Sequence, residues 1–203
     1  MLAETVYKRL AKLQRPVHDG KVVWLNSQYM QVTEAAGSVA DRVVQLNSVC
    51  WLELVTTISG VLPGRYQARF CLKFLPQWWT DELRITATPS EGCGQPTSRL
   101  YTWQQLRDAI GPAGVWVQLS TGTFTMTSPG SVEVRLDAHS GSWKRDMLFD
   151  VAQLVREQGP VGRSWRQHAQ QQQQQGSQDT EPAAGQGLLD AVRQGLQEAC
   201  HMQ

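Results

Sequence analysis

Residues 66–74, which read YQARFCLKF, carry the clearest strand signal in this 203-residue chain. Every second position carries an apolar or aromatic side chain, namely Tyr66, Ala68, Phe70, Leu72 and Phe74. The positions between them carry Gln67, Arg69, Cys71 and Lys73. Successive side chains of a strand point to opposite faces, so this alternation predicts a strand with one face against a core. The preceding residues 62–65 (LPGR) have the composition of a turn.

The same reasoning extends outward to a series of short strands separated by turn signals. We expect them at residues 22–25, 43–46, 50–57, 83–88, 115–119, 132–136 and 147–155. Residues 89–98 are rich in Gly, Pro and Ser and are expected to form a loop. Thr102 and Gln105 have the spacing of a capping box, which predicts one or two helical turns ending at Gly111. So many short strands with almost no helix predict an all-β, antiparallel β-sandwich with short peripheral helices.

The two ends of the chain differ from this central region. Leu2, Val6, Leu10 and Leu13 have helical spacing, which predicts a short helix that Pro16 ends. We therefore divide the chain into an N-terminal segment (1–28), a sandwich (29–157), a disordered Gln-rich linker (158–187) and a C-terminal amphipathic helix (188–203). Six consecutive glutamines, 170–175, lie in the linker, which has too little apolar area to offset the entropy of ordering. The last helix could dock on the sandwich, bind a partner or do neither.

Composition argues against several classes of partner. The formal net charge is +1 and only 18% of residues are charged, so we expect no nucleic-acid partner. The N-terminus has no apolar signal region and no stretch approaches a membrane span, so we expect no membrane partner and a soluble cytoplasmic or nuclear protein. The four cysteines match neither a metal clip nor a disulfide scaffold, and we expect them to be reduced.

Catalytic motifs are missing from the sequence. It has no G-x-S-x-G elbow, no H-E-x-x-H and no phosphate-binding glycine loop. The four histidines have no ligand-like spacing. We therefore expect no catalytic residues, no metal and no cofactor, and a binding protein in place of an enzyme.

The central region resembles the phloem-lectin (phloem protein 2, Nictaba-like) domains of plant F-box proteins. Residues 29–54 (YMQVTEAAGSVADRVVQLNSVCWLEL), 62–74, 114–124 and 131–157 follow that family's motifs in order. The last of these blocks also resembles animal F-box-associated glycan-binding domains, through Trp143-Lys144. Both resemblances imply a sandwich of the jelly-roll, galactose-binding-like type that binds carbohydrate.

Residues 6–26 (VYKRLAKLQRPVHDGKVVWLN) resemble the linker that joins an F-box to this lectin domain. The sequence departs from the family pattern in two places. The five residues before Val6 do not supply an F-box, and the family's W-G-x-T-P element is missing before Tyr29. A truncated F-box protein, a splice form and a divergent stand-alone lectin would all have this sequence.

The resemblance places a glycan site on the loop that precedes the last strand. The apolar face of a pyranose stacks on an indole, while its hydroxyl groups need a few oriented polar partners. Trp143 would supply the indole and Lys144 the donors, with Ser142 and Gly141 leaving room for the ring. The alternative is that Trp143 is a core residue that begins the last strand.

Other tryptophans are candidates for secondary contacts. Trp78 and Trp79 lie in a loop-like segment, and two adjacent indoles cannot both point inward on a strand, so we expect one to be exposed. Trp116 alternates with two valines and is expected to face away from the core. For Trp51 and Glu53, core packing is the favoured interpretation.

Two functional hypotheses follow. The first is a lectin that binds N-acetylglucosamine oligomers or N-glycan cores, on free glycans or glycoproteins. The second is a substrate-adaptor fragment of a ubiquitin ligase that binds a polypeptide client, with the ligase scaffold as a partner if an F-box is encoded upstream.

Overall fold

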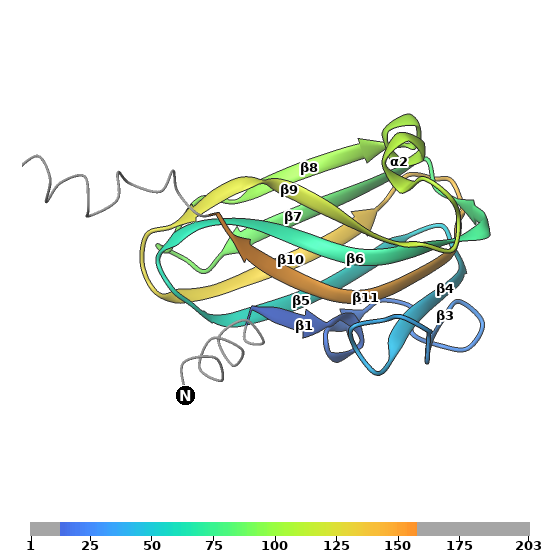
Figure 1. Ribbon diagram of the computed structural model, residues 1–203, viewed down its shortest axis with the longest axis horizontal. Coiled ribbons are helices and arrows are strands. Elements are labelled where there is room, and N and C mark those ends of the chain that lie inside the picture. The colour runs from blue at the N-terminus through green and yellow to red at the C-terminus, as the bar shows by residue number, and fades with distance from the viewer. Residues whose placement is uncertain (1–12, 158–203) are drawn as a thin grey trace, which may run out of the picture. The chain divides into compact units, whose positions relative to one another are not determined.

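A computed structural model describes residues 13–157, and these form two antiparallel sheets that pack face to face (Figure 1). One sheet has the order β3 (Met30–Thr33), β4 (Val43–Val49), β11 (Lys144–Arg156), β6 (Gly64–Trp79) and β9 (Trp116–Met126), with β1 (Gln14–Pro16) also paired to β11. The other has the order β2 (Lys21–Val22), β5 (Leu52–Val61), β10 (Gly130–Ala138), β7 (Glu82–Pro89) and β8 (Thr97–Thr102). Within residues 13–157 the helical elements are the single turn η1 (Val17–Asp19) and α2 (Trp103–Ile110).

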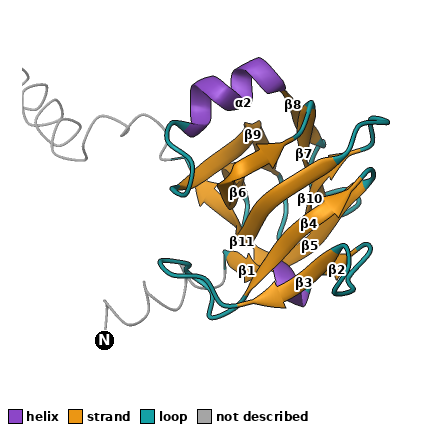
Figure 2. Ribbon diagram, turned by 90° about the vertical axis from the view of Figure 1, so that its right-hand side faces the viewer, coloured by secondary structure: helices purple, strands orange, loops and turns teal. Residues whose placement is uncertain are grey.

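The strands from β4 to β11 are paired in a nested order. β4 pairs with β11, β5 with β10, β6 with β9 and β7 with β8, and successive pairs alternate between the two sheets. This is the jelly-roll arrangement, in which a chain folded back on itself is wound into two sheets. The predicted antiparallel sandwich is thereby confirmed. The nesting also brings the β4–β5 and β10–β11 connections to the same end, although about ninety residues separate them in the sequence (Figure 2).

The core lies between the sheets, and the alternation in β6 is what builds it. Tyr66, Phe70 and Phe74 are at most 2% exposed and belong to one continuous apolar cluster. Cys71, on the opposite face of the same strand, is also buried. A loop covers the outer face of the sheet on this side. Its Val39 and Ala40 amides donate hydrogen bonds to the buried carboxylate of Asp150 at 2.6 and 2.9 Å. One strand therefore contributes to two buried layers.

Three predictions about local structure are corrected. The strand expected at 22–25 ends at Val22, and β6 continues through Trp78 and Trp79, which were expected in a loop. Part of the expected 89–98 loop belongs to β8, which has a mostly exposed face and therefore a weak apolar pattern. The capping box is confirmed, since the Thr102 hydroxyl accepts from the Gln105 amide and the Gln105 side chain accepts from the Thr102 amide.

The N-terminal helix, the Gln-rich linker and the C-terminal helix were predicted for segments that lie almost wholly outside the described residues. Residues 13–157 contain no helix with the length and apolar character that crossing a bilayer requires.

Candidate functional site

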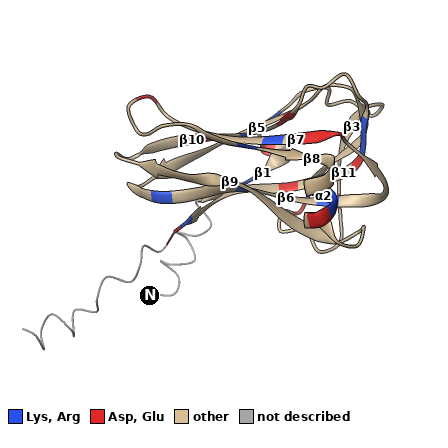
Figure 3. Cartoon of the chain, turned by 90° about the horizontal axis from the view of Figure 1, so that it is seen from above, with Lys and Arg blue, Asp and Glu red and all other residues tan. Residues whose placement is uncertain are grey.

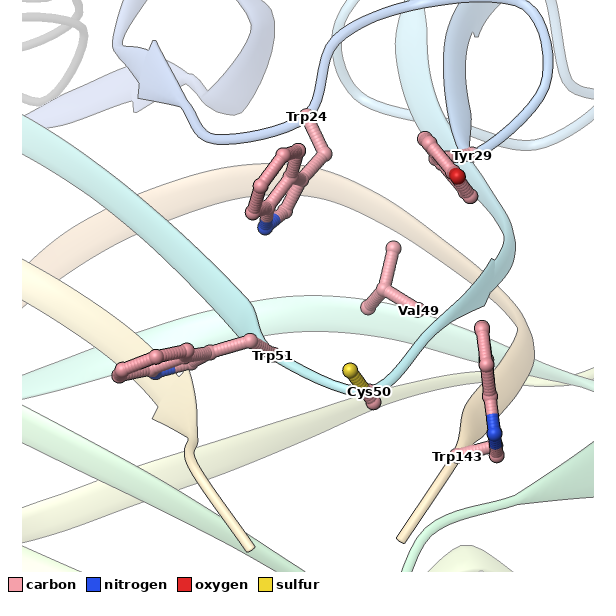
Figure 4. Close-up of a pocket in the computed structure, with 6 residues that line it drawn as sticks. All are labelled: Trp24, Tyr29, Val49, Cys50, Trp51 and Trp143. Carbon is pink, nitrogen blue, oxygen red and sulfur yellow. The ribbon is translucent and has the colours of Figure 1, made fainter. Parts of the chain in front are cut away.

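An aromatic pocket lies at the end of the sandwich where the β2–β3, β4–β5 and β10–β11 connections meet (Figure 4). Its volume is about 130 Å³. The residues that line it are Trp24, Tyr29, Val49, Cys50, Trp51 and Trp143. Four aromatic rings from three separate connections thus surround one depression, which we call the aromatic pocket.

Trp143 is the last residue before β11, and its side chain is 57% exposed. The alternative in which it packs into the core is therefore excluded by its exposure. In Figure 4 its ring stands at one side of the pocket, with Cys50 and Val49 between it and Trp51. Trp143 is available as a stacking surface.

Trp51 was expected in the core but is 56% exposed. The chain bends at Cys50 and Trp51, between β4 and β5, so the run 50–57 is not one continuous strand. The His139 imidazole packs edge-on against the indole, with ring centroids 5.1 Å apart. Its Nε2 lies 3.7 Å from a carboxylate oxygen of Glu53, whose side chain is 20% exposed, so Glu53 lies at the sheet surface and not in the core.

Trp24 and Tyr29 complete the pocket and were not among the predicted site residues. Trp24 has a positive φ of 66°, which is uncommon for a bulky side chain. The turn that holds it there depends on Asn26, whose side-chain oxygen accepts from the Gln28 and Tyr29 amides at 3.0 and 3.1 Å. The two rings meet edge to face at 6.3 Å. Backbone in such a conformation is concentrated at binding sites, where surrounding contacts maintain it.

Lys144 has a different place from the one expected. Its side chain is fully buried, and its Nζ lies 2.6 to 2.9 Å from four oxygens of the protein. These are the carbonyls of Cys50, Ser140 and Ser142 and the Ser140 hydroxyl. An ammonium has three protons, so none is left for a sugar. The expectation that Lys144 donates to a ligand is corrected: it ties the β4–β5 bend to the loop that carries Trp143.

Asp81, in the β6–β7 turn, supports the same loop. Its Oδ1 accepts from the Ser140 hydroxyl at 2.7 Å and lies 3.9 Å from Lys144 Nζ. Desolvation raises the pKa of Asp81, but the hydroxyls of Ser140 and Ser142 and the Lys144 charge together hold it below its ordinary value. Burial lowers the pKa of Lys144, and the charge of Asp81 offsets only part of that effect.

Gly141 and Ser142, the two residues before Trp143, have different surroundings. The Ser142 carbonyl is a partner of Lys144, so this residue is partly committed to holding the loop. Gly141 is exposed, and a Cβ placed on it would meet no atom within 4 Å. Space for a ligand is therefore open on the Gly141 side of the loop.

The three tryptophans expected to make secondary contacts, Trp78, Trp79 and Trp116, differ in exposure and in the groups that they contact. Trp78 packs edge-on against Phe74 at 4.8 Å and contributes to the core, whereas Trp79 is 42% exposed, which confirms that one of the pair is exposed. Trp116 lies on the outer face of its sheet, where its indole N–H donates to the Ala36 carbonyl and Lys73 Nζ lies 4.6 Å from the ring centroid. Protein contacts thus occupy Trp78 and Trp116, and only Trp79 remains open.

The chemistry of the pocket is that of stacking. In the part of the chain that the structure describes, no group of three His, Cys, Asp or Glu side chains is placed to hold a metal ion. Acidic and basic residues are both spread over the described strands in the view of Figure 3. Indole faces and a phenol ring with open space beside them suit a ligand that has both apolar C–H faces and hydroxyl groups.

Comparison with solved structures finds similar folds at low sequence identity. The GH26-CBM35 β-(1,4)-mannanase of Podospora anserina has a TM-score of 0.45 and 13% identity, with 72% of this chain and 28% of that chain covered. A carbohydrate-binding module of Cellvibrio mixtus lichenase 5A, in complex with cellotriose, has a TM-score of 0.42 and 12% identity, with 71% and 97% covered. A cycloalternan-forming enzyme of Listeria monocytogenes, in complex with a pentasaccharide substrate, has a TM-score of 0.45 and 10% identity, with 70% and 12% covered. This chain thus spans less than a third of the two enzymes.

No curated protein sequence matches the chain. The sequence model of one family, phloem protein 2, does match it, over residues 18–155. The matched region contains the whole jelly roll from β4 up to the penultimate residue of β11, together with every residue that lines the aromatic pocket. The chain belongs to the phloem protein 2 family.

Proposed function

We propose that the chain is a lectin that binds N-acetylglucosamine-containing glycans, either free oligomers or the core of N-glycans, in the aromatic pocket. The observation that carries the proposal is the convergence of Trp24, Tyr29, Trp51 and Trp143 on one depression. Exposed indoles are costly to leave in water, and a cluster of them marks a binding surface.

The geometry supports stacking by Trp143 as the principal contact. Lys144 and Asp81 hold its loop from beneath, so the indole is presented by a fixed backbone and loses little freedom on binding. Trp51 and Trp24 lie on the other side of Val49 and Cys50 from Trp143 (Figure 4), where they would contact the other face or the acetamido methyl group of a sugar. Polar partners would come from the Tyr29 hydroxyl and the indole N–H groups.

Titration of intrinsic tryptophan fluorescence with chitotriose and with a high-mannose N-glycan tests the proposal. We expect saturable quenching in the intact chain, because a sugar would change the surroundings of three exposed indoles. Trp143→Ala should abolish the response. More than half of this residue is exposed, so the variant should still fold, which a cooperative unfolding transition would verify.

The matched control is Trp116→Phe, which removes an indole from the outer face of the six-stranded sheet. This variant should titrate like the intact chain. Lack of response to either sugar by the folded protein would contradict the lectin proposal. Equal responses from Trp143→Ala and the intact chain would contradict the assigned site.

The second proposal concerns a polypeptide client, and it rests on the resemblance of residues 6–26 to an F-box linker. In that case the exposed indoles would anchor a protein ligand, and a ubiquitin-ligase scaffold would be the partner of an F-box. An F-box encoded in frame upstream of Met1, together with the absence of any sugar response, would favour this adaptor over the lectin.

A further inference from the structure

A second aromatic cluster, in which Trp79 is exposed, lies where β6 ends and α2 begins. The rings of Trp79 and Trp103 are 6.0 Å apart at an angle of 47°, and the Arg107 guanidinium lies 4.6 Å from the centroid of the Trp103 ring. Contact with α2 covers part of Trp79, yet 42% of this residue remains exposed. We call Trp79, Trp103 and Arg107 the second aromatic cluster.

Asp81 connects this cluster to the loop of Trp143. The Asp81 side chain accepts a hydrogen bond from the Ser140 hydroxyl, in the loop that carries Trp143. The Asp81 backbone carbonyl accepts a hydrogen bond from the Trp103 amide at 2.8 Å. The first turn of α2 and the Trp143 loop are therefore held by opposite ends of one residue. Their relative position is fixed by short hydrogen bonds on both sides.

The pairing of β11 with β6 sets the direction in which the two surfaces face. Trp143 and Arg145 are exposed while Lys144 between them is buried, which is the alternation of an extended chain. Arg145 is the register partner of Trp79, and directly opposed residues share a face. Strand spacing and rise then place the Trp79 and Trp143 backbones roughly 8 Å apart. A short oligosaccharide spans such a distance.

We propose that the second aromatic cluster is a further subsite for the same glycan, which takes a pyranose residue one or more units beyond the residue held at Trp143. This inference rests on the proposed lectin function. Trp79 would supply the stacking face, and the guanidinium groups of Arg107 and Arg145 would donate to hydroxyl or acetamido oxygens. Among residues 13–157, neither arginine forms an ion pair, so these donors are open to a ligand.

Isothermal titration calorimetry with chitobiose and chitohexaose tests the subsite. The intact chain should bind the longer sugar more tightly. Trp79→Ala should reduce that length preference by about 3- to 10-fold, the range expected for one aromatic contact, and should leave the affinity for chitobiose unchanged. Trp79→Phe, which keeps a ring at this position, should restore most of the preference.

The outcomes separate this inference from the function on which it rests. A length preference that is the same in Trp79→Ala and the intact chain would overturn the subsite and leave the lectin intact. Equal losses for chitobiose and chitohexaose in Trp79→Ala would also overturn it, because Trp79 would then act by positioning the Trp143 loop. Binding of neither sugar by the intact, folded chain would overturn both proposals.

Discussion

The buried ammonium of Lys144 lies 3.9 Å from the carboxylate of Asp81, and the Ser140 hydroxyl is within hydrogen-bond distance of both. This arrangement joins the β4–β5 bend, the β6–β7 turn and the β10–β11 loop beneath the aromatic pocket. A charge is kept in a buried position only when it is paired and hydrogen-bonded, and here the partners come from the connections that carry Trp51 and Trp143. Lys144 therefore both stabilises the fold and fixes the connections that carry Trp51 and Trp143.

Replacing Lys144 by methionine should destabilise the fold. The variant keeps most of the length of the side chain but leaves the carbonyls of Cys50, Ser140 and Ser142 without their donor. Each buried acceptor left unpaired costs about 1–3 kcal/mol, so we expect a loss of at least about 2 kcal/mol in the free energy of unfolding. Urea denaturation measures it. The control, Arg145→Met, removes a neighbouring exposed cation and should change the midpoint little; equal midpoints for both variants would contradict the role of Lys144.

The pKa of Asp81 gives stability a dependence on acid pH. Because this pKa is lower in the folded state than the ordinary value of 3.8, the carboxylate contributes fully above 3.8. The contribution is lost as the pH falls through the lower, folded-state pKa. Thermal unfolding of the intact chain and Asp81→Asn should therefore differ at neutral pH and converge in acid. Asp81 is partly exposed, so the difference should be modest, about 1 kcal/mol or less. A gap that stays constant with pH would refute this assignment.

Sugar binding should protect Cys50 from alkylation. Cys50 is exposed and lines the aromatic pocket, whereas Cys71 is buried and desolvation, with a smaller effect of the Asp150 charge, raises its pKa to about 11. At neutral pH iodoacetamide should modify Cys50 much faster than Cys71, because the thiolate is the reactive form. Saturating chitotriose should slow only the Cys50 reaction, as followed by peptide mass mapping. If the sugar binds and the Cys50 rate does not change, the ligand does not occupy this pocket.

Asp150 should control the loop that covers the outer face of the six-stranded sheet. In Asp150→Asn, one of the two oxygens that accept from Val39 and Ala40 becomes a donor, so one amide loses its partner. Hydrogen bonds to a charged group contribute about 1.5–3 kcal/mol, and we expect a loss of that size together with faster hydrogen exchange at these two amides. Asp41→Asn makes the same change at an exposed position near the loop and serves as control. Unaltered exchange in Asp150→Asn would show that other contacts hold the loop.

Strands were predicted correctly where apolar side chains alternate regularly along the buried face of the strand. The alternation of residues 66–74 placed the central strand β6, and a capping box at Thr102 placed α2, because both signals arise within a few residues of chain. Predictions failed where an element has little covered surface. β8 is such a case, since most of its side chains are exposed and its apolar pattern is correspondingly weak.

Of the candidate site, the sequence predicted the Trp143 loop but not the rest of the pocket. Trp51 looked like part of a strand because the bend at Cys50 contains no glycine or proline, and Trp24 owes its position to a positive φ that its neighbours impose. Lys144 looked like a free donor, since burial of an ammonium depends on oxygens supplied by segments such as Cys50, which lies 94 residues away in the chain.

Side-chain alternation and capping act over short stretches of chain, so they were enough to predict the all-β class, the approximate strands and the helix cap. The loop that carries Trp143 was predicted from the family resemblance. Tertiary contacts were needed to establish which tryptophans are exposed, how four aromatic rings meet, and that Lys144 faces inward. The nested pairing of β4 with β11 and β5 with β10 brings distant connections together, and contacts between such segments leave no periodic signal in either one.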